Sequence, residues 1–103
     1  MKTTLEVVNV TVGKSFEGHE TWAITLRSTE HNIDWIDYKL TFDPRGHSQA
    51  RIVFEALLGN LTRLADKDIR PFHLVRKQCI ADIREAANPI NFHTVEAYNL
   101  RSK

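Results

Sequence analysis

The sequence predicts a mainly β domain in which five strands form a Greek-key barrel and one helix separates the third strand from the fourth. The main observation is the order of patterns along the chain: three strand-like stretches precede the one clearly helical stretch, and two follow it. The chain has 103 residues, the size of one domain with one core, so residues 1–103 are expected to form a single unit. A hydrophobic content of 42% is typical of a globular domain and argues against a disordered or transmembrane chain.

The first strand is expected over residues 5–12, a stretch rich in valine. The adjacent Val7 and Val8 interrupt its alternation, as happens at a β-bulge or in a strand buried on both sides. Residues 13–20 contain two glycines and are expected to form a loop. Two side chains suited to contact a ligand are exposed by this loop: Lys14 and Phe16.

The second and third strands show the clearest alternation in the chain. The second strand, residues 21–28, places its large apolar side chains on one face and Arg27 on the other. In the third strand, residues 33–43, the apolar residues again share one face. Because side chains two apart lie on the same side of a sheet, Trp35 and Lys39 are expected together on the face opposite the core.

The helix is expected over residues 48–65, between the third and fourth strands. Its apolar residues recur three and four positions apart and form one stripe. The stripe consists of Ile52, Val53, Ala56, Leu57, Leu61 and Leu64. Gly59 is expected in the helix interior, where glycine costs about 1 kcal/mol relative to alanine.

The last two strands are expected over residues 73–84 and 92–100. A charged linker containing Pro71, which cannot continue a helix, leads into the fourth strand. Residues 85–91 are expected to form a turn around an Asn-Pro pair. The residues expected to face the core from these strands are Cys79, Ala81, Ile83, Val95 and Ala97.

Three strands, a helix and two strands in this length is the layout of the OB-fold, a five-stranded Greek-key barrel. In that fold, ligands lie across strands two and three. The loops between strands one and two and between strands four and five flank the ligand. The same elements could also form an α+β sandwich with the helix on one open face of the sheet, so the barrel is the preferred interpretation of two.

Charge and cysteine content limit the function classes. Residues 1–69 carry eight Lys and Arg against ten Asp and Glu, whereas residues 70–103 carry six against three. The formal charge of +1 is low for a protein that binds duplex DNA electrostatically. The single cysteine excludes an internal disulfide, and no signal-peptide or membrane-spanning run is visible, so a cytoplasmic protein without membrane contact is expected.

The sequence contains no motif for catalysis or metal binding. The histidines and Cys79 are scattered without the paired spacing of zinc ligands. The densest ionisable cluster is HNIDWID, residues 31–37, but Asp34 and Asp37 fall on opposite faces of a strand. No phosphate-binding glycine loop is present. We therefore expect a non-enzyme with no metal and no cofactor.

A binding surface remains as the functional prediction. Single-stranded nucleic acid is held by aromatic rings that stack on bases and by cations that follow the phosphates. Asp37 lies between Trp35 and Lys39, and its charge opposes this interpretation. The predicted nucleic-acid-binding residues are Lys14, Phe16, Arg27, Trp35, Lys39, Arg76, Arg84, Phe92 and Tyr98.

Five stretches of the chain carry a family resemblance: VTVGKSFEGHETWAITLRS, IDWIDYKLTF, ARIVFEALLG, VRKQCIADI and NFHTVEAYNL. They resemble small bacteriophage-type single-stranded DNA-binding proteins with an OB-fold. The last two are similar to a strand of the pattern K-x-C-x-A-x-I and a final strand carrying N-x-x-x-V. The matching residues are Lys77, Cys79, Ala81, Ile83, Asn91 and Val95.

The resemblance implies sequence-tolerant binding of single-stranded DNA during replication, recombination or repair, in the host cytoplasm if the protein is phage-encoded. RNA is an alternative ligand, and a homodimer or contacts with replication or recombination proteins are also expected. Many such proteins end in an acidic tail that recruits partners, whereas this chain ends with the basic run Arg101-Ser102-Lys103. The rival prediction is a protein-interaction module or accessory subunit on the same barrel, favoured by the low net charge and a surface tryptophan.

Overall fold

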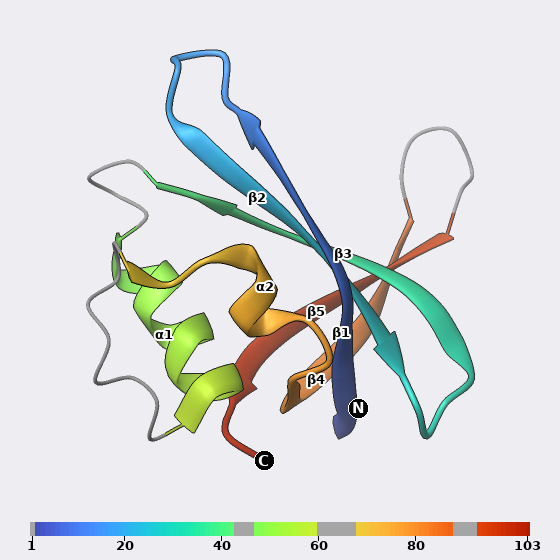
Figure 1. Cartoon of the computed structure of the whole chain (residues 1–103). Coiled ribbons are helices and arrows are strands. Elements are labelled where there is room, and N and C mark those ends of the chain that lie inside the picture. The colour runs from blue at the N-terminus through green and yellow to red at the C-terminus, as the bar shows by residue number, and fades with distance from the viewer. Residues whose placement is uncertain (1, 43–46, 60–67, 88–92) are drawn as a thin grey trace.

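The computed structural model describes residues 2–42, 47–59, 68–87 and 93–103. One antiparallel sheet of five strands curls into a half-barrel, and two helices lie beside it (Figure 1). The strands are β1 (Lys2–Lys14), β2 (Glu20–Ser28), β3 (Ile33–Thr41), β4 (Gln78–Ala87) and β5 (His93–Arg101). The helices are α1 (His47–Leu58) and α2 (Pro71–Leu74). The mainly β class, the five strands and the helix after the third strand are confirmed.

The strand order is β3-β2-β1-β4-β5. The fourth strand returns to lie beside the first, so the order β4-β1-β2-β3 is that of a Greek key. The two edge strands, β3 and β5, contact each other across the opening of the half-barrel, although they are not hydrogen-bonded neighbours in the described sheet. The β1–β2 and β4–β5 hairpins diverge towards opposite sides of Figure 1.

A β-bulge in β1 divides this strand into two parts. The register between β1 and β2 shifts between Val7 and Asn9, which confirms the bulge as one of the two explanations for the Val7–Val8 pair. Val7 is buried, whereas Val8 is 46% exposed. The residues before the bulge pair with both β2 and β4, and those after it pair with β2.

The core fills the space between the concave side of the sheet and the helices. Trp22 contacts two other rings, with centroid distances of 4.9 Å to Phe42 and 5.8 Å to Phe54 of α1. Apolar residues predicted to face inward are buried: Trp22, Ile24, Leu26, Ile36, Leu40, Cys79, Ala81 and Ile83. Burial also raises the pKa of the Cys79 thiol to about 11, as expected for an inert core cysteine.

Within the described part of the chain, the helix α1 is shorter than predicted. α1 ends at Leu58, and Gly59 follows it with φ +56°. A left-handed glycine is a common helix terminator because it has no Cβ to clash, so Gly59 ends the helix and does not lie inside it. Ile52, predicted in the buried stripe, is 54% exposed. The remaining predicted helical residues, 60–65, lie outside the described residues.

The fourth strand begins later than predicted. Pro71 starts the short helix α2, where its missing N–H has no helical partner to lose. The N–H of Arg70 donates to Nδ1 of His73 at 2.8 Å and holds this turn in place. The chain then turns through Arg76, whose φ is +69°, before β4 begins. Residues 85–87 of the predicted turn belong to β4 instead, and residues 88–91 lie outside the described residues.

Candidate nucleic-acid interface

The outward face of β2 and β3 brings together three of the predicted residues. Arg27 of β2 and Trp35 and Lys39 of β3 are all exposed on this face. A shift in the β2–β3 register sets Asp34 and Trp35 together opposite Arg27. This second bulge places Trp35 next to Arg27 of the neighbouring strand.

The Trp35 side chain makes one hydrogen bond and is otherwise mostly exposed to solvent. Its indole Nε1–H donates to Oδ1 of Asp37 at 2.9 Å, and the residue is 67% exposed. The negative charge of Asp37 opposes nucleic-acid binding, but its hydrogen bond orients the Trp35 ring. Within the described residues, Lys39 makes no ion pair. The face therefore carries an exposed aromatic ring, two cations and the carboxylate that accepts the indole hydrogen bond.

The β1–β2 hairpin carries the next two predicted residues. Lys14 ends β1, and Phe16 lies in the turn, where it is completely exposed. Backbone bonds close the turn: the N–H of Ser15 donates to the carbonyl of His19 at 2.7 Å, and that of Gly18 to the carbonyl of Ser15 at 2.9 Å. A phenyl ring in water at the end of a closed turn adds nothing to the core, so it is available for a ligand.

Arg27 and Arg76 line one open depression of about 450 Å³, together with Glu6, Val7 and Val8. Two nitrogens of the Arg27 guanidinium contact Oε2 of Glu6: Nη2 at 2.6 Å and Nε at 2.9 Å. Hydrogen bonds from Gln78 and Arg27 lower the pKa of the Glu6 carboxyl. Arg76 was predicted to lie on the fourth strand and lies instead in the turn before it.

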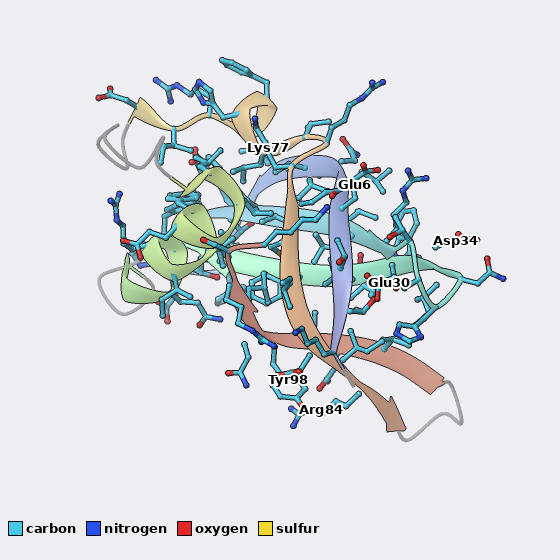
Figure 2. The ribbon with its side chains drawn as sticks, turned by 90° about the horizontal axis from the view of Figure 1, so that it is seen from below. Glu6, Glu30, Asp34, Lys77, Arg84 and Tyr98 are labelled. Atoms are coloured by element: carbon cyan, nitrogen blue, oxygen red, sulfur yellow. The ribbon has the colours of Figure 1, made fainter. Side chains whose placement is uncertain are left out.

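Arg84 and Tyr98 form a separate group on the outward face of β4 and β5. The Arg84 guanidinium carbon lies 5.1 Å from the centre of the Tyr98 ring, and its Nε lies 3.1 Å from Oε2 of Glu96. Figure 2 shows Arg84 and Tyr98 on the opposite side of the barrel from Glu6 and Lys77. Because Glu6 lines the depression with Arg27 and Arg76, the structure sets this pair apart from that depression. Phe92, the remaining predicted residue, lies outside the described residues.

Sequence reasoning missed Glu6 as a member of this site. Its ion pair with Arg27 joins residues 21 positions apart in the chain and depends on the β1–β2 register. The Val7–Val8 pair was the one local signal, because it marked the bulge next to Glu6. Nothing in the sequence around Arg76 indicated that its backbone would be left-handed.

Other kinds of site receive no support from the described residues. No group of three or more His, Cys, Asp or Glu side chains among them could hold a metal ion. None of the described helices is long and apolar enough to cross a membrane. The sequence matches no protein-family model and no curated protein.

Proposed function

We propose that this protein is a non-catalytic OB-fold protein that binds single-stranded DNA, largely independently of base sequence, across the outward face of β2 and β3. The observation that carries the proposal is Trp35, a tryptophan 67% exposed with its indole N–H held by Asp37. Stacking on such a ring is worth about 1–3 kcal/mol per base and is available to every base. Replication, recombination and repair are the processes in which a protein of this kind acts.

Three features support the OB-fold part of the proposal. The strand order β3-β2-β1-β4-β5 and the contact between β3 and β5 are compatible with a partly open five-stranded barrel. The helices lie in the chain between β3 and β4. The hairpin with Phe16 joins β1 to β2, and an OB-fold uses this loop to flank its ligand.

The cations favour a nucleic acid as the occupant of this face. Lys39 follows Trp35 on β3, and Arg27 faces Trp35 from β2. Lys14 lies next to the turn at the tip of the β1–β2 hairpin. Phosphates can pair with these side chains while the bases stack on Trp35 and Phe16. A protein-interaction module is the second candidate, supported by the complete exposure of Phe16 and the formal charge of +1.

The test is a titration of tryptophan fluorescence with a thymine oligonucleotide at low and moderate salt. Trp22 is 4% exposed and serves as an internal reference, because the ligand cannot reach it in the folded protein. We expect quenching in the wild type that weakens as salt rises and is largely lost in Trp35→Ala. A uracil oligonucleotide of the same length compares RNA with DNA. Absence of binding at low salt would reject the proposal and favour the protein-interaction module.

A further inference from the structure

The depression between Arg27 and Arg76 crosses β1 at its bulge. Its floor includes Val7 and the half-exposed Val8, and the two arginines reach it from elements on either side of β1. Arg27 comes from β2, and Arg76 comes from the turn before β4. Figure 2 shows Glu6, which lines the depression, and Lys77 on the same side of the half-barrel. Because Glu6 of β1 pairs with Arg27 of β2, the depression adjoins the outward face of β2.

The depression has more positive than negative charge, because the single carboxylate, Glu6, attracts both Arg27 and Arg76. Arg27 is occupied by Glu6 through two short contacts. Arg76 makes no hydrogen bond through its side chain and no ion pair within the described residues. Two guanidinium groups and one carboxylate thus surround an open space, with a net charge of +1. A guanidinium group matches the oxygens of a phosphate in geometry and in charge.

The backbone at Arg76 is held in an unfavourable conformation. Its φ of +69° is uncommon for a residue with a Cβ, and such outliers persist where the surrounding structure fixes them. The surroundings here are two backbone hydrogen bonds: the N–H of Arg76 donates to the carbonyl of Val7 at 2.8 Å, and the N–H of Val7 donates to the carbonyl of Lys77 at 2.9 Å. These bonds attach the Arg76 turn to β1 and keep it at the depression.

We propose that a phosphate of the bound single strand lies in this depression between Arg27 and Arg76. The strand then runs from Trp35 across β2 and β1 to the turn before β4, away from Arg84 and Tyr98. Glu6 competes with the phosphate for the Arg27 guanidinium and so limits the affinity. The proposal rests on the proposed function, because it specifies the path of the ligand beyond Trp35.

The test compares Arg76→Asn with Arg84→Asn in fluorescence anisotropy titrations of a fluorescein-labelled thymine oligonucleotide over a series of salt concentrations. Both variants lose one positive charge, and asparagine tolerates the left-handed backbone at position 76. For Arg76→Asn we expect a loss of affinity of about fivefold and a salt slope smaller by about 0.7, the value for one phosphate contact on a single strand. Arg84→Asn is expected to stay close to the wild type. Far-UV circular dichroism checks that each variant is folded.

A second variant, Glu6→Gln, tests the competition directly. Glutamine keeps a side-chain oxygen for Arg27 and Gln78 but removes the negative charge, so we expect binding tighter by about threefold. An unchanged or weaker affinity would overturn the position of the phosphate beside Glu6. Equal losses in Arg76→Asn and Arg84→Asn, or a larger loss in the latter, would overturn the proposed path.

The two proposals fail in distinguishable ways. If the wild type does not bind the oligonucleotide at low salt, both are rejected. If it binds and Trp35→Ala weakens the binding, but Arg76→Asn behaves like the wild type, the site on β2 and β3 stands and the phosphate position is rejected.

Discussion

Trp22 and Trp35 lie on neighbouring strands of one sheet, and each donates its indole N–H to a carboxylate two residues away. Trp22 donates to Glu20 at 3.0 Å, and Trp35 donates to Asp37 at 2.9 Å. The two residues differ in burial: Trp22 is 4% exposed among aromatic rings on the concave side, whereas Trp35 is 67% exposed on the convex side. The same local arrangement therefore builds the core in one case and leaves a ring open to a ligand in the other.

The largest expected effect is a difference in the free energy of unfolding between the alanine variants of these two tryptophans. Trp22→Ala removes contacts with Phe42 and Phe54 and should lower the free energy of unfolding by about 3–5 kcal/mol. Trp35→Ala removes a surface side chain and should change it by no more than about 0.5 kcal/mol. Urea unfolding followed by circular dichroism measures both. A comparable loss of stability in Trp35→Ala would mean that this ring serves the fold.

The next effect is a difference in binding between variants of Trp35 and of Tyr98, a second exposed aromatic residue on the convex side of the described sheet. The Arg84 guanidinium lies over the Tyr98 ring, so a base would have to displace a cation to stack there. Trp35→Ala should weaken binding of a thymine oligonucleotide by about 1–3 kcal/mol, and Tyr98→Ala by much less. Anisotropy titrations of both variants give the comparison. If Tyr98→Ala is the weaker binder, the ligand uses the β4–β5 face.

The comparison also shows how far the sequence could predict the structure. Alternation with a period of two identified the strands and put Trp35 and Lys39 on the outward face, because residues two apart in a strand share a side. The sequence could not separate the Arg84–Tyr98 pair from the other predicted residues. Their place on the side of the half-barrel opposite Glu6 arises from the curl of the sheet, which depends on all five strands together.

Two other features could not be predicted from local sequence patterns, and the reasons differ. The end of α1 was misplaced because the apolar spacing continues past Gly59, and only its positive φ shows that the helix stops there. Arg76 was placed on a strand because it falls in the polar phase opposite the core residues Cys79 and Ala81. Hydrogen bonds from a distant strand, at Val7, hold that segment as a turn instead.

A smaller effect is expected at the carboxylate that holds Trp35. Asp37→Asn keeps an oxygen to accept the indole hydrogen bond but removes a negative charge from the face. Two unit charges 4 Å apart in water interact by about 1 kcal/mol, so the variant should bind a thymine oligonucleotide up to about fivefold more tightly. Glu55→Gln, on the exposed side of α1, is the matched control and should not change the affinity. Weaker binding by Asp37→Asn would show that the carboxylate itself contacts the ligand.

The smallest effect concerns the acid sensitivity of the fold at Glu6. Hydrogen bonds from Gln78 and Arg27 lower the pKa of this carboxyl from 4.5, so the folded protein keeps it ionised at pH values where the unfolded chain takes up a proton. The stability that Glu6 contributes is therefore present above about pH 4.5 and is lost as the pH falls through the lowered pKa of the folded state.

In Glu6→Gln this source of pH dependence is absent, so the free energy of unfolding should fall less steeply below about pH 4.5 than in the wild type. Urea unfolding at a series of pH values measures the two slopes. Asp82→Asn is the parallel variant on the β4–β5 face, because hydrogen bonding from Asn99 and the charge of Arg101 lower the pKa of Asp82. Identical slopes in Glu6→Gln and the wild type would mean that Glu6 does not hold Arg27 in solution. Arg27 would then be free to bind a phosphate without competition.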